Sequence, residues 1–107
     1  MESAAPFTAR VESGKGVARV ALIGDLDLAT VPILEDHLSQ VEADEVAEIT
    51  LDLHELTFID TMGIHAFLAA RERAKTKGRR LIRVGVGPPT RRLLELTDTQ
   101  FLLHGDP

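Results

Sequence analysis

Residues 47–86 read AEITLDLHELTFIDTMGIHAFLAARERAKTKGRRLIRVGV, a run in which three patterns follow one another. Residues 47–53 alternate apolar with polar side chains, which is typical of a β-strand. Residues 61–77 carry apolar side chains at helical spacing and precede Gly78, a residue suited to the left-handed position after a helix. Residues 81–86 are again mostly apolar and β-branched. A strand, a helix and a second strand in this order predict a parallel pair with a right-handed crossover.

The chain before this run predicts a hairpin and a first helix. Residues 7–11 and 17–23 are short β-branched segments that flank the turn sequence SGKG at residues 13–16, which is typical of antiparallel strands. Apolar side chains then recur at helical spacing over residues 31–41, and Thr30 marks the start of that helix.

After residue 86, Pro88 opens a predicted short helix, and residues 101–103 form a predicted last strand. The predicted order is therefore ββαβαβαβ. This order predicts an α/β fold: a mixed sheet of four to five strands with an N-terminal β-hairpin and helices packed on it. We expect residues 1–107 to form a single domain, because the chain shows no linker and no internal repeat.

Composition excludes several classes of protein. The 107 residues are 44% hydrophobic, enough for one domain that buries about 65% of its unfolded surface. There is no cysteine, which excludes a disulfide framework and favours a reducing, cytoplasmic location. The net charge of -5 argues against nucleic acid binding. We expect no signal peptide and no membrane insertion, because no apolar run approaches the roughly 20 residues of a spanning helix.

Motifs for catalysis or cofactors are missing from the sequence. It contains no nucleophile elbow, phosphate-binding loop or dinucleotide fingerprint, so we expect neither an enzyme nor a cofactor. The four histidines lack ligand spacing. Asp25, Asp27 and Asp60 could form a Mg²⁺ cluster as in a receiver domain, but such a domain does not open with a hairpin. The alternative is that Asp25 and Asp27 shape a turn and cap a helix.

Three stretches resemble the STAS domain, and within it the stand-alone bacterial anti-sigma factor antagonists. They are GDLDLAT at residues 24–30, FIDTMGI at residues 58–64 and PPTRRLLELT at residues 88–97. The resemblance spans nearly the whole chain, and the three stretches occur in the family's order. It implies a protein that binds an anti-sigma factor of the serine/threonine kinase type and so releases a sigma factor.

The resemblance also implies a phosphoacceptor hydroxyl after an aspartate at the start of a helix, which here are Thr61 and Asp60. The family usually has serine at the acceptor position and a small residue next, where this chain has Thr61 and Met62. A phosphatase is then the implied second partner. The alternative is that Asp60 or Thr61 merely caps the helix.

A helical projection of residues 61–77 places Met62 and His65 opposite the apolar face, beside Thr61. The resemblance implies that the loop containing Asp25 borders the same partner surface. The predicted partner-binding residues are Asp25, Asp27, Thr30, Asp60, Thr61, Met62 and His65. Exposed apolar residues are also common without any function, so this alternative stays open.

Two further interpretations remain. A structural STAS subunit of a membrane transporter complex, which binds the cytosolic ATPase of that complex, is the alternative function. Separately, seven lysines and arginines lie within residues 71–83, a pattern typical of a solvated helix end that complements the helix dipole.

Overall fold

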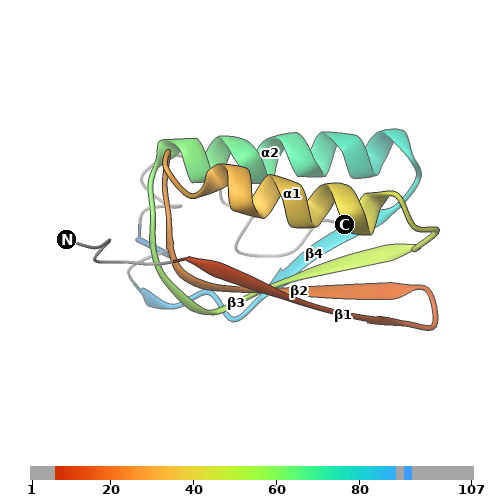
Figure 1. Cartoon of the computed structure of the whole chain (residues 1–107), viewed down its shortest axis with the longest axis horizontal. Helices are drawn as coiled ribbons and strands as arrows, with labels where there is room; N and C mark the ends of the chain where they lie inside the picture. Colours follow the sequence, from red (N-terminus) through yellow and green to blue (C-terminus); the bar gives the residue numbers. More distant parts are fainter. Residues whose placement is uncertain (1–6, 89–90, 93–107) are drawn as a thin grey trace.

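A computed structural model describes residues 7–88 and 91–92 (Figure 1). Its helices and strands are β1 (Thr8–Gly14), β2 (Val17–Leu26), α1 (Val31–Glu42), β3 (Glu48–Ile59), α2 (Thr61–Thr76) and β4 (Arg80–Val84). The predicted order is confirmed through β4. Pro88, Arg91 and Arg92 are helical, but the remainder of the predicted last helix and the strand at 101–103 lie outside the described residues.

The four strands form one sheet in the order β1-β2-β3-β4. β1 and β2 pair antiparallel, joined by a tight turn in which Lys15 and Gly16 have φ angles of 56° and 78°. β2 and β3 pair parallel, as do β3 and β4. The mixed α/β fold with an N-terminal hairpin is therefore confirmed.

Both helices cover the same face of the sheet (Figure 1), and the core lies between them and the strands. Leu34 of α1 and Phe67 of α2 have no exposed surface, and they pack in one cluster with Leu22 and Leu51 of the sheet. On α2, Ala66 is buried and Leu68 is half-buried. Burial of such side chains is the main favourable contribution to folding.

The third strand is longer than predicted. The alternation of residues 47–53 predicts an end near Leu53, whereas β3 continues to Ile59. Its buried positions after Leu53 are Leu56 and Ile59, three residues apart, because the β2–β3 register shifts between Ala21 and Ile23 and again after Gly24. Such irregularities rotate the following side chains relative to the sheet.

One end of the sheet gathers the segments that carry the predicted site. β2 leads into α1 and β3 leads into α2, so the first turns of both helices lie at the same end (Figure 1). The Asp60 N–H donates to the Leu26 carbonyl at 3.1 Å and joins the two strand ends. Within the described part of the chain, no helix is long and apolar enough to cross a membrane.

Candidate functional site

Asp60 is the residue that begins α2. Its backbone is extended, and its carboxylate Oδ1 accepts a hydrogen bond from the Gly63 N–H at 3.0 Å. Its other oxygen, Oδ2, accepts from the Leu28 N–H at 3.3 Å. Asp60 is therefore the N-cap, and by satisfying one amide of the first turn it stabilises the helix by about 1 kcal/mol.

Thr61 is the first residue of α2, and its side chain is exposed. The capping role belongs to Asp60, so the Thr61 hydroxyl is not required to hold the helix. Amide N–H groups at the start of a helix have no partner within the helix and point toward a negative group placed there. A phosphate on Thr61 would meet these donors and the positive end of the helix dipole.

Gly63 fixes how closely α2 approaches the sheet. A Cβ at this position would lie 2.7 Å from Cγ1 of Ile59 and 3.0 Å from Cγ of Leu26. Real Cβ atoms essentially never show a contact of 2.7 Å, so any larger residue forces the helix start or the neighbouring side chains to shift. The glycine thus places Thr61 close to the ends of β2 and β3.

The predicted residues at the end of β2 and in the loop to α1 are held by hydrogen bonds within this segment and to β3. Oδ1 of Asp27 accepts from the N–H groups of Ala29 and Thr30 at 3.0 and 3.1 Å. The Thr30 hydroxyl donates to the Asp25 carbonyl at 2.7 Å, and Oδ1 of Asp25 accepts from the Thr57 hydroxyl at 2.6 Å. Asp27 therefore shapes the turn. Thr30 occupies the N-cap position of α1 without making a side-chain cap bond.

Carboxylates concentrate at this end without forming a metal site. Asp25, Asp27 and Asp60 are each half-buried, and each uses a carboxylate oxygen in the bonds above. No group of three histidine, aspartate or glutamate side chains among residues 7–88 and 91–92 is placed to hold a metal ion. The three carboxylates add negative charge at this end of the sheet.

Exposed apolar side chains occur in the segments next to Thr61, and two of them are absent from the predicted set. Leu28 and Phe58 are 67% and 50% exposed, and the predicted Met62 is 39% exposed. We call these three residues the apolar patch. His65, one turn after Met62, is also exposed, as predicted. Leu28 lies in a polar loop and Phe58 in a segment predicted to be loop, so neither belongs to a periodic pattern that would draw attention to it.

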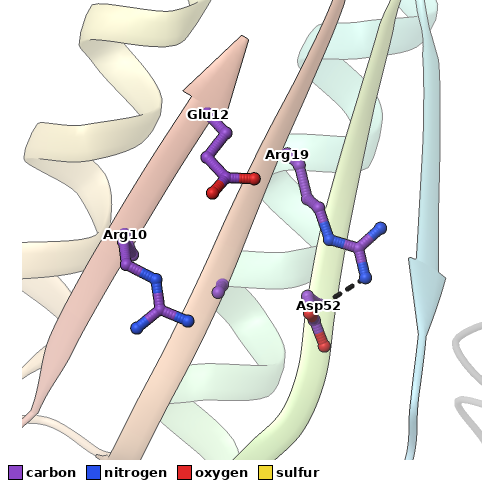
Figure 2. Close-up of a pocket in the computed structure, with 5 residues that line it drawn as sticks. Arg10, Glu12, Arg19 and Asp52 are labelled. Atoms are coloured by element: carbon purple, nitrogen blue, oxygen red, sulfur yellow. Dashed lines mark hydrogen bonds and ion pairs between the residues drawn. The ribbon is translucent and has the colours of Figure 1, made fainter.

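A second polar cluster lies on the face of the sheet that carries no helix (Figure 2). Arg10, Glu12, Arg19, Ala21 and Asp52 line a hollow of about 40 Å³ there. An Arg19 nitrogen donates to Asp52 at 3.0 Å, and Nδ1 of His54 lies 2.7 Å from the other Asp52 oxygen. Burial acts to raise the pKa of Asp52, but hydrogen bonds from His54 and Arg19 outweigh it and hold the pKa below its ordinary value. The hollow is too small for more than about one water molecule.

Comparison with known proteins gives a consistent result. A family profile described as the STAS domain matches residues 8–106. The anti-sigma-B factor antagonist of Staphylococcus aureus is 30% identical over 81 residues, which cover 76% of this chain and 75% of that protein. A crystal structure of an anti-sigma factor antagonist from Mycobacterium paratuberculosis has a TM-score of 0.75 and 31% identity, covering 89% of this chain and 80% of the other. The Bacillus protein SpoIIAA in its phosphorylated form shares the fold, with a TM-score of 0.68 at 20% identity, covering 84% of this chain and 83% of the other.

Proposed function

This chain belongs to the STAS domain family, and we propose from that membership that it is an anti-sigma factor antagonist whose partner binding is switched by phosphorylation of Thr61. Two relatives at 30% and 31% identity are named anti-sigma factor antagonists, which supports the first part of the proposal. In the unphosphorylated state the protein binds an anti-sigma factor of the serine/threonine kinase type, which frees a sigma factor. A phosphatase restores the binding state.

The observation that carries this proposal is the separation of roles between Asp60 and Thr61. Asp60 caps α2, while the Thr61 hydroxyl is exposed and free for a kinase to reach. Here the modification adds charge at a position that the fold does not use.

The apolar patch and the carboxylates explain how that charge would change binding. A partner that covers Met62 and Phe58 removes the neighbouring Thr61 from water. Phosphorylation adds about 1.5 to 2 negative charges there, close to Asp60 and Asp25. Burying an unpaired dianion in an interface is strongly unfavourable, so the partner is released without refolding of this protein.

The proposed function also accounts for the expected lack of catalysis and cofactor, for the cytoplasmic location and for the contact residues. A protein that acts by binding needs no catalytic centre and no cofactor, and its partners in transcription are cytoplasmic. Of the predicted contact residues, we assign direct contact to Met62, His65 and Thr61. Asp25, Asp27 and Thr30 border the same surface but also hold the loop through their hydrogen bonds.

Phosphorylation with the cognate kinase and ATP, followed by mass spectrometry, tests the acceptor. We expect phosphate on Thr61 and no labelling of Thr61→Ala. Thr76→Ala is the matched control, because Thr76 is an exposed threonine at the other end of the same helix and should leave labelling unchanged. Quantitative labelling of Thr61→Ala would show that the acceptor lies elsewhere.

A pull-down from cell lysate separates this function from the transporter alternative. Recovery of a kinase-like ATPase without a sigma factor supports the proposal, because binding of this protein to the anti-sigma factor releases the sigma factor. Recovery of transporter subunits instead would identify a structural subunit.

A further inference from the structure

A cavity of about 190 Å³ lies at the end of the molecule away from Thr61, where α2 ends. Its lining residues are Glu42, Arg73, Thr76, Lys77 and Arg79. The 16 residues of α2 separate it from Thr61 by about 24 Å at 1.5 Å per residue. It is therefore distinct from the surface assigned to the anti-sigma factor.

Arg73 and Glu42 neutralise each other inside this cavity. The Arg73 guanidinium donates to both Glu42 oxygens, at 2.9 and 3.0 Å, and also to Glu35 of α1 at 3.3 Å. The bond to Glu42 is the main cause that raises the pKa of Arg73 above its ordinary value. The Glu42 carboxylate, which faces the cavity, is thus already paired with the Arg73 guanidinium.

Lys77 and Arg79 carry positive charge that no carboxylate balances. Arg79 donates to the carbonyls of Val46 and Asp44 at 2.9 and 3.3 Å, and both acceptors are neutral. Lys77 is exposed and forms no ion pair with any other residue that the structure describes. A guanidinium has five N–H groups, so Arg79 keeps donors for a ligand after its two backbone bonds.

The C-terminal end of a helix normally repels an anion, but here three of its last carbonyls accept hydrogen bonds from the following residues. The N–H groups of Lys77, Gly78 and Arg79 donate to carbonyls of the last turn of α2, at 2.9 to 3.2 Å. This arrangement, with Gly78 at a φ of 67°, satisfies the groups that carry the negative end of the dipole.

We propose that this cavity binds a doubly charged oxyanion group, such as the phosphate of a small phosphorylated metabolite. Arg73 is shared by Glu42 and Glu35, so within the described residues the lining cations without a carboxylate partner are Lys77 and Arg79, and their two charges match a dianion. The volume equals that of about six water molecules and falls below the roughly 300–1,000 Å³ of pockets for larger ligands. A phosphate with a few further atoms fits, and a nucleotide does not.

Titration of the full ¹⁵N-labelled chain with sodium phosphate at pH 8 tests this site by NMR. Sodium chloride should hold the ionic strength constant, so that general screening is subtracted. We expect saturable shifts of the backbone amides at residues 42–46 and 76–79, and no saturable shift at Thr61. Shifts that never saturate, or that sodium chloride alone reproduces, would overturn the proposal.

Two lysines two residues apart provide a matched pair of variants. Lys77→Gln should weaken phosphate binding about tenfold, the effect of losing one charge-assisted hydrogen bond. Lys75→Gln removes the same charge from the same helix, but Lys75 pairs with Glu72 at 3.7 Å and does not line the cavity, so binding should be unchanged. Equal weakening in both variants would mean a response to net charge and no defined site.

Acetate provides the test of ligand class. A single negative charge leaves one excess cation unmatched, so acetate should bind at least tenfold more weakly than phosphate under the same conditions. Acetate binding as tight as that of phosphate would show that the cavity does not select a dianion. Neither result depends on the anti-sigma factor, so the site and the proposed function can fail separately.

Discussion

The backbone N–H of Leu28 donates to the Asp60 carboxylate at 3.3 Å, although 32 residues separate the two in sequence. One side chain thus begins α2 and also fixes the loop that leads into α1. The loop and the helix start are consequently joined next to Thr61, and under the proposed function a partner would meet both at once.

Replacing Asp60 by alanine should lower the free energy of unfolding by about 1 to 2 kcal/mol, because a cap bond and the bond to Leu28 are both lost. Asp60→Asn keeps an acceptor oxygen and should cost less. Asp36→Ala, at an exposed position of α1, serves as the control and should change little. Urea unfolding measures all three. A loss for Asp60→Ala no greater than for Asp36→Ala would contradict the capping role.

Charge at position 61 should control partner binding without changing the fold. Thr61→Glu should bind the anti-sigma factor roughly 100-fold more weakly than the wild type, equivalent to about 3 kcal/mol, with an unchanged Tm. Thr61→Ala should bind tightly even after treatment with kinase and ATP. Calorimetric titration gives the affinities. If Thr61→Glu binds like the wild type, the interface lies elsewhere or the protein is not a phosphorylation switch.

Truncating the apolar patch should weaken the same complex. Phe58→Ala should reduce affinity at least tenfold, because exposed aromatic side chains dominate interface energies, and Leu28→Ala should act in the same direction. Val17→Ala is the control, since Val17 is 37% exposed but lies next to the β1–β2 turn. Surface plasmon resonance compares the three. An effect of Val17→Ala as large as that of Phe58→Ala would exclude a localised surface.

Gly63→Ala should destabilise the protein by about 1 to 3 kcal/mol, because its methyl group would overlap with Ile59 and Leu26 in the core. Gly14→Ala is the matched control, since a Cβ at that position has no atom within 4 Å. Thermal unfolding should show a lower Tm for Gly63→Ala alone. Equal Tm values for the two variants would show that the helix start adjusts freely.

Stability should depend on pH through Asp52. Its pKa is lower in the folded than in the unfolded chain, so its contribution is present above the unfolded value of about 3.9 and is lost as pH falls through the folded value. Asp52→Asn should therefore lose less stability than the wild type as the pH falls below about 5. Urea unfolding at a series of pH values measures this. Parallel curves for the two proteins would contradict a stabilising charge at Asp52.

The regular part of the fold could be predicted because its patterns are local. The turn at residues 13–16, the spacing of α2 and the position of Gly78 each depend on near neighbours in sequence. The end of β3 could not be predicted, because its side chains rotate where the β2–β3 register shifts. That shift is set by pairing with a strand far away in sequence.

The same distinction applies to the candidate site. Asp60 and Thr61 stand in a recognisable motif, so their position at the start of a helix was predictable. Phe58 was not, because its exposure follows from the irregular pairing of β3 with β2. The cavity beside Lys77 depends on residues from α1 and from the end of α2. The sequence shows the basic cluster. Which of its cations pair with carboxylates is set by contacts in the fold, such as those of Arg73 and Arg79.

The close packing of Gly63 has a consequence for how duplicated copies of such a protein diverge. Within residues 60–63, the fold constrains Asp60 through its hydrogen bond to Leu28 and Gly63 through its packing against the core. Met62 has an exposed side chain between them, so its replacement costs little stability. Under the proposed function, duplicated copies could change partners at this position and avoid crosstalk while the helix start stays intact.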